Sequence, residues 1–231
     1  MAISTLESGQ TYLGTEVVMF TTAEDLERVP FRRNRFQQGF ALVYLCIWIL
    51  LSLGPRTRYG WLLESLPLFL MVPVLAWVHR KGPLSDLSWC CFGGAALLHM
   101  VGAHYTYAQV PFGQWLQGLL GLQRNPYDRL VHFTYGLAIA YPMREILLQA
   151  IPARGFWSYW LPFNGILASS AAYEIVEWAI AVRVPAPVAE AYVAVQWDVW
   201  DAQKDMLMAT LGAALCLGFL AWWHRRADRM A

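Results

Sequence analysis

Six long apolar stretches alternate with polar or mixed segments along the chain. They cover about residues 37–53, 61–78, 87–107, 127–150, 156–182 and 201–223. Each is close to the roughly 20 residues that an α-helix needs to cross the hydrocarbon core of a bilayer. The pattern therefore predicts an all-α, polytopic membrane protein, a bundle of about six transmembrane helices with interfacial loops.

The composition supports a membrane protein. The 231 residues are 58% hydrophobic and only 14% charged, whereas soluble domains are about a quarter charged. A net charge of +1 gives no support for nucleic-acid binding, so the partners that we expect are membrane lipids. The four cysteines all lie in apolar stretches and fit neither a disulfide framework nor a zinc ribbon. The sequence leaves the oligomeric state open.

The distribution of Lys and Arg predicts the orientation, because cytoplasmic loops carry an excess of these residues. Eleven of the 17 fall on one side when the N-terminus is cytoplasmic. We therefore expect both termini in the cytoplasm, with residues 1–36 as an N-terminal segment, 37–224 as the transmembrane domain and 225–231 as a short basic tail. No apolar stretch follows Met1 closely, so a cleaved signal peptide is not expected.

Two long loops lie on the predicted outer side. Residues 108–126 contain an amphipathic piece at 114–122, and residues 184–200 are mildly apolar and aromatic. These loops are expected to be either lids or interfacial helices in the outer leaflet, or ordinary connectors between helices.

Ionisable residues gather at the outer ends of four of the predicted helices. They are His99, His104, Asp128, His132, Glu174, Glu177, Asp198, Asp201 and Asp205. In three of these helices the spacing is i, i+3 or i, i+4, which places the side chains on one face. His99 and His104 are five residues apart and diverge around the helix, so we favour His104, which lies nearer the surface. Ionisable groups inside a membrane are costly, and their convergence on one side indicates a polar pocket.

The residue types in this pocket suit a divalent metal. Clustered carboxylates repel one another unless a cation lies between them, and mixed imidazole and carboxylate ligands favour zinc, manganese or iron. The predicted metal ligands are His104, Asp128, His132 and Asp201. The predicted catalytic groups, acting as acid or base, are Glu174, Glu177 and Asp205. The predicted substrate-binding residues are Arg129, Lys204, Tyr105 and Trp200.

A metal-bound water at the outer leaflet would hydrolyse an ester, amide or phosphate bond. We therefore expect a metal-assisted hydrolase or transferase that acts on a lipid or envelope substrate. One alternative is a non-enzymatic transporter or lipid- or drug-binding protein, in which the acidic face is a proton or cation site. Another is a structural subunit, in which the aspartates cap helices and Glu–His pairs join them. The inner halves of these helices carry almost no ionisable residues, which disfavours a continuous polar path.

Several blocks resemble the signature of a known family. The segments HMVGAHYTYAQVPFG, LGLQRNPYDRLVHFTYG, REILL, YEIVEWAIA and QWDVWDAQKDMLMATLGA are similar to those of the YjdF-type bacterial inner-membrane proteins, a domain of unknown function. The resemblance covers about residues 40–223. A weaker similarity to VanZ-like membrane proteins, which are linked to glycopeptide-antibiotic resistance, rests on Asp128 with His132 and on Asp205 with Gly212. These resemblances imply a multi-pass protein of the bacterial inner membrane and no particular reaction.

Overall fold

The structure is a computed structural model that describes residues 29–230, and helices make up most of that range. It contains eight α-helices and a short 3₁₀ turn, and no strand occurs between residues 29 and 230. The elements are α2 (Arg35–Ser52), α3 (Arg58–Lys81), α4 (Asp86–Tyr105), η1 (Tyr107–Gln109), α5 (Pro111–Leu120), α6 (Tyr127–Ala150), α7 (Trp157–Ala181), α8 (Ala186–Tyr192) and α9 (Asp201–Asp228). The all-α prediction is confirmed.

The six long helices lie where the apolar stretches predict them. The largest difference is at the end of α9, which reaches Asp228 instead of 223, so that most of the predicted basic tail is helical. The amphipathic piece at 114–122 corresponds to α5, and the loop at 184–200 contains the short helix α8. Most of the predicted N-terminal segment, residues 1–28, lies outside the described residues.

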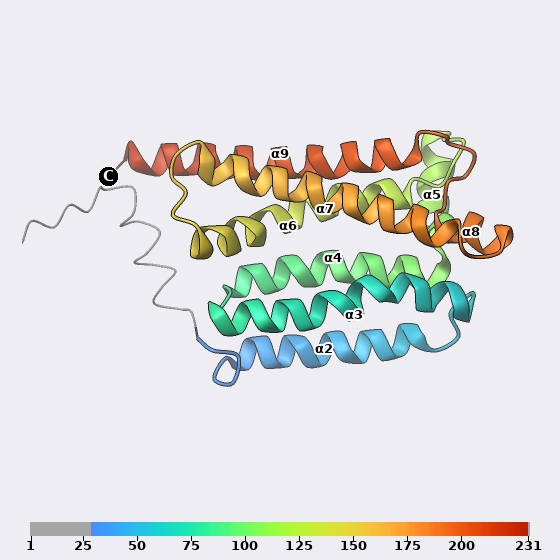
Figure 1. Cartoon of the computed structure of the whole chain (residues 1–231), viewed down its shortest axis with the longest axis horizontal. Coiled ribbons are helices and arrows are strands. Elements are labelled where there is room, and N and C mark those ends of the chain that lie inside the picture. The colour runs from blue at the N-terminus through green and yellow to red at the C-terminus, as the bar shows by residue number, and fades with distance from the viewer. Residues whose placement is uncertain (1–28, 231) are drawn as a thin grey trace, which may run out of the picture.

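The long helices run side by side, with α2, α3 and α4 on one side and α6, α7 and α9 on the other (Figure 1). Helix α6 is central and packs against α4, α7 and above all α9, while α2 and α3 pack on α4. The first turns of α6 and α9 lie at one end of the bundle together with α5 and α8 (Figure 1). The polar stretches that open α6 and α9 therefore meet at this end, which we call the site end.

Within the described residues, α2, α3 and α9 are long and apolar enough to cross a membrane by length and composition. Helix α7 also exposes large apolar side chains, including Ile175, Val176 and Trp178. Helices α4 and α6 expose few, because their neighbours cover them; Leu87 and Leu137 are their exposed large hydrophobic residues. The bundle thus presents an apolar outer surface, as a protein surrounded by lipid requires.

Two glycines set the contact between α6 and α9. A Cβ atom on Gly136 would collide with the backbone of Ala209, and one on Gly212 would collide with the backbone of Phe133. Small residues allow helix backbones to approach this closely in membranes. Gly136 lies one turn after His132, and Gly212 lies two turns after Asp205. The close crossing of α6 and α9 therefore determines how His132 and Asp205 lie relative to each other. In α4, a Cβ atom on Gly93 would meet the rings of Phe40 and Tyr44 of α2.

A second buried polar cluster lies at the opposite end of the bundle. Glu145 of α6 accepts hydrogen bonds from the Ser85 backbone N–H at 2.8 Å, from the Ser85 hydroxyl at 2.9 Å and from the Ser88 hydroxyl. The carboxylate thereby sits at the N-terminus of α4, where a negative charge is favourable. Glu145, the acidic residue of the REILL block, therefore connects α6 to the start of α4.

Candidate functional site

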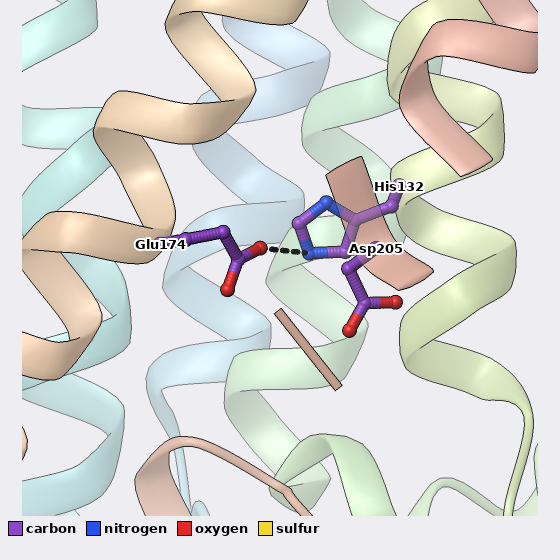
Figure 2. Close-up of side chains that lie close together, drawn as sticks. All are labelled: His132, Glu174 and Asp205. Carbon is purple, nitrogen blue, oxygen red and sulfur yellow. Dashed lines mark ion pairs between the residues drawn. The ribbon is translucent and has the colours of Figure 1, made fainter. Parts of the chain in front are cut away.

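Three helices bring potential metal ligands together at the site end. His132 of α6, Glu174 of α7 and Asp205 of α9 each offer a ligand atom, and these atoms lie within 4.8 Å of one another. Figure 2 shows the carboxylates of Glu174 and Asp205 near the ring of His132. The Nε2 atom of His132 is 3.6 Å from Oε1 of Glu174. Asp205 is only 2% exposed, and its Oδ1 has no hydrogen-bond partner in the described structure.

A second group shares Asp205. Asp128 of α6 and Asp201 of α9 place carboxylate oxygens within 4.8 Å of it and of each other. Here, however, an arginine supplies the positive charge. Arg124 forms an ion pair with Asp201 and lies 3.8 Å from an oxygen of Asp128. This second group is therefore an Arg–carboxylate network, whereas His132, Glu174 and Asp205 form no ion pair with Lys or Arg anywhere in residues 29–230.

Asp198 lies at the rim and anchors the start of α9. It binds Nζ of Lys204 at 2.7 Å, forms an ion pair with Arg129 and accepts the backbone N–H of Trp200 at 3.1 Å. The hydrogen bond from Lys204, aided by those from Trp200 and Arg129, holds the pKa of Asp198 well below its usual range. Arg129 and Lys204, predicted to bind substrate, have their charges engaged by Asp198.

The loops before α6 and α9 are locked together. The Gln196 side chain accepts the backbone N–H of Asn125 at 2.9 Å and donates to its carbonyl at 3.1 Å. The Asn125 side chain is buried and donates to the carbonyls of Ala108 and Val110. Gln196, Trp197 and Ala194 all adopt positive φ angles, a conformation that costs free energy in non-glycine residues. These hydrogen bonds therefore hold a strained loop beside the start of α9.

A cavity of about 160 Å³ adjoins the polar residues. Its polar end includes Asp128, His132 and Tyr173, and its other end is apolar. Ser170 also lines the cavity; it is 2% exposed, and its hydroxyl has no hydrogen-bond partner in the described part of the chain. The site thus joins ionisable groups to an apolar chamber between α3, α4, α6 and α7.

The sequence analysis favours His104 over His99 for the site, but in the structure His99 is the histidine of α4 that lines the cavity. His99 lines the cavity, where Nε2 bonds the Glu64 carbonyl at 2.7 Å and Nδ1 bonds the Tyr107 hydroxyl. His104 bonds the Leu51 carbonyl in the last turn of α2 at 2.8 Å, and it belongs to neither group of potential ligands among the described residues. The preference for His104 as a ligand is not supported, because the helix turns its ring toward α2.

The three remaining predicted residues are Glu177, Tyr105 and Trp200, and none of them belongs to the two groups of potential ligands among residues 29–230. Glu177 lies one turn after Tyr173, a residue of the cavity lining, in α7. Tyr105 packs its ring against that of His104, and Trp200 is 62% exposed at the start of α9. The last two therefore lie away from the His132–Glu174–Asp205 group and give no contact to the cavity.

Two important residues were not predicted as site residues. Arg124 contributed to the prediction only as one of the Lys and Arg residues counted for the orientation. Its i, i+4 spacing to Asp128 indicates that the two side chains can meet on one helix face. Glu64 of α3 is 2% exposed, and its Oε2 has no partner in residues 29–230. Tyr192 of α8 lies close to it: burial raises the pKa of Tyr192, and the carboxylates of Glu177, Glu64 and Glu174 raise it further. Glu64 is thus a buried acidic residue next to His99, which bonds its carbonyl at 2.7 Å, and a single carboxylate in an apolar stretch gave no spacing pattern to reveal this.

Comparison with known proteins places the whole bundle in one family. The family described as "Predicted membrane protein (DUF2238)" matches residues 36–226. The chain belongs to this family. The DUF2238 match runs from α2 to near the end of α9 and contains every residue of the site.

A relative of the chain is "Inner membrane protein YjdF" of Escherichia coli (strain K12). The two are 39% identical over 190 residues, which are 82% of this chain and 90% of that protein. No solved structure matches. The resemblance seen in the sequence blocks is therefore confirmed, and the protein is an inner-membrane protein of the DUF2238 family.

Proposed function

We propose that the protein is a metal-assisted hydrolase or transferase that acts on a lipid or envelope substrate at the outer leaflet. His132, Glu174 and Asp205 would hold one divalent ion. One imidazole and two carboxylates form a mixed nitrogen and oxygen ligand set, which suits zinc, manganese or iron. The predicted ligands Asp128 and Asp201 remain beside this ion, and Arg124 balances the charge of Asp201.

The observation that carries the proposal is the contrast between the two carboxylate groups. Burying a carboxylate without a partner costs several kcal/mol. Asp201 has Arg124, whereas the buried Oδ1 of Asp205 and Oε1 of Glu174 have no hydrogen-bond partner in residues 29–230. A cation between Asp205, Glu174 and His132 would supply the missing positive charge.

Asp128 is the candidate general base. It lines the cavity, and its Oδ1 is 3.7 Å from Nε2 of His132. A bound ion makes water acidic enough to give hydroxide near neutral pH. Asp128 would take the proton of this water, the hydroxide would form a bond to the carbonyl or phosphoryl centre, and the proton would pass to the departing oxygen as its bond breaks. In a transferase, an acceptor hydroxyl would replace the water.

The proposal includes the six-span topology with both termini in the cytoplasm. Helices α4 and α6 are shielded by their neighbours, so a moderate hydropathy is compatible with spanning. The excess of Lys and Arg at the end opposite the site then directs the site toward the outer side. Because α6 and α9 bring their polar first turns to that end, the pocket would open near the outer leaflet.

The core beneath the site favours an enzyme or binding protein over a transporter. The residues that pack the bundle on the far side of the cavity are apolar: Ile139, Ala140, Ile166, Ala209, Ala213 and Leu217. A transporter would need polar groups to continue between the helices. This apolar layer separates the site from the Glu145 cluster at the other end.

Metal analysis of the purified protein tests the proposal. Protein produced with added zinc, manganese and iron, and purified without chelator, should contain about one ion per chain. Asp205→Asn and Glu174→Gln should weaken metal binding at least about 100-fold, because changes to groups that merely support a ligand already cost roughly 10–100-fold. Asp198→Asn is the matched control and should retain the metal. Folded wild-type protein that remains metal-free under these conditions would refute the proposal.

A further inference from the structure

We propose that the cavity beside His132 binds a compact apolar group of an amphiphilic substrate that carries an oxygen function next to that group. This inference rests on the proposed function, because it assigns the substrate class of the same site. It is supported by the shape and lining of the cavity, and by one buried hydroxyl that has no hydrogen-bond partner among residues 29–230.

The cavity has two chemically different ends. Asp128 and His132 line it beside the proposed ion, while Leu68, Met71 and Phe92 line it farther inside. A ligand that reaches both ends must be polar at one end and apolar at the other. Removing apolar surface from water supplies the binding free energy in the apolar end, and the ion fixes the polar end.

The volume limits the apolar group. A dry engineered cavity of about 150 Å³ in another protein binds benzene, and the cavity here measures about 160 Å³. A ring or a chain of about six carbon atoms would therefore fill it. A longer acyl chain would extend out of the cavity, so each further methylene would add little to the binding affinity.

Ser170 distinguishes this cavity from a purely apolar one. Its neighbour Ser169 bonds the Tyr135 hydroxyl at 2.7 Å and donates to the Gly165 carbonyl at 2.8 Å. Ser170 lines the same cavity, and its buried hydroxyl has no hydrogen-bond partner in the described part of the chain. A buried polar group without a partner destabilises the protein, and a hydrogen bond to a ligand oxygen would remove that cost. The ligand is thus an ester, ether or alcohol amphiphile and not a plain hydrocarbon.

Alkyl hydroxamates test the apolar part, since the hydroxamate binds divalent metals and the chain can enter the cavity. Calorimetric titration of metal-loaded protein in nanodiscs would compare acetohydroxamate with its four-, six-, eight- and ten-carbon homologues. Affinity should rise roughly fourfold per methylene up to about six carbons and then level off. Ala96→Phe, which fills the cavity, should keep the acetohydroxamate affinity and lose this rise. Leu68→Trp is a second filling variant if Ala96→Phe does not fold.

The outcomes separate the two proposals. If the protein binds no metal and no acetohydroxamate, the proposed function fails. If acetohydroxamate binds in a metal-dependent way but the chain-length series is the same in wild-type and filled variants, the ion stands and the cavity assignment is overturned. Long-chain hydroxamates also partition into the nanodisc lipid, and this effect is equal for the wild-type protein and the filled variant. The difference in affinity between these two proteins therefore measures binding in the cavity.

The oxygen function is tested with two probes of equal length, hexanohydroxamate and 3-ethoxypropanohydroxamate. Ser170→Ala should weaken binding of the ether about fivefold, as expected for one hydrogen bond, and leave the alkyl probe unchanged. An equal effect on the two probes would remove Ser170 from the recognition of the substrate.

Discussion

Arg124 connects three parts of the site through one side chain. It forms an ion pair with Asp201, lies 3.8 Å from Asp128, and donates to the carbonyls of Ala194 and Val195. It thereby ties the loop before α6 to the loop before α9. Its side chain is only 11% exposed, so its charge cannot be replaced by water without rearrangement.

We predict that Arg124→Met destabilises the protein by about 3 kcal/mol or more, because removing one member of a buried ion pair leaves its partners charged and unpaired. The measurement is the free energy of unfolding in mixed micelles. Arg183→Met is the control, since Arg183 is exposed at the end of α7 and bonds a carbonyl of its own helix. Adding Asp201→Asn to Arg124→Met should recover part of the loss. Equal stability of the Arg124 and Arg183 variants would show that the network contributes nothing.

At the scale of elements, the sequence predicts helices well and their partners poorly. The boundaries of α6 at 127–150 follow directly from the apolar pattern. The i, i+4 spacing of Asp128 and His132 also places them on one face, but it does not show which helix lies opposite. That information depends on the backbone contact at Gly136 and Gly212, which are two glycines among 17 in the sequence. For the same reason the sequence does not show which histidine of α4 faces the cavity, since the orientation of α4 depends on its neighbours.

The contact between α6 and α9 leads to a prediction about glycines of the same helix. Gly212→Ala should destabilise the bundle by about 1–3 kcal/mol, the usual cost of overpacking, because its Cβ would meet backbone atoms of α6. It should also weaken metal binding, since Asp205 and His132 would be pushed apart.

Gly218→Ala is the matched control, because a Cβ at Gly218 meets nothing within 4 Å. This change should be neutral or slightly stabilising, since alanine favours a helix over glycine. Thermal unfolding and metal content of the two variants check the prediction. Identical behaviour at positions 212 and 218 would mean that the close crossing does not set the geometry of the site.

At the scale of the whole molecule, lipid-facing side chains and polar ends determine how the bundle sits in a membrane. The site end carries α5, on which Phe112, Trp115 and Leu119 are exposed, and the loop with exposed Trp197. Aromatic side chains prefer the interface between lipid and water. This end is therefore suited to lie in the headgroup region, where an amphiphile could enter the cavity with its polar part last.

The six-span arrangement predicts which positions a membrane-impermeant maleimide reaches in intact cells. In a variant that lacks Cys46, Cys90, Cys91 and Cys216, Gln123→Cys and Val199→Cys should be labelled from outside, because both lie in exposed loops at the site end. Arg154→Cys, in the exposed connection between α6 and α7 at the other end, should react only after the cells are opened. The reverse pattern would place the site in the cytoplasm and exclude an outer-leaflet substrate. If Gln123→Cys and Arg154→Cys reacted from the same side, α6 would not cross the membrane, and the bundle would span it with fewer than six helices.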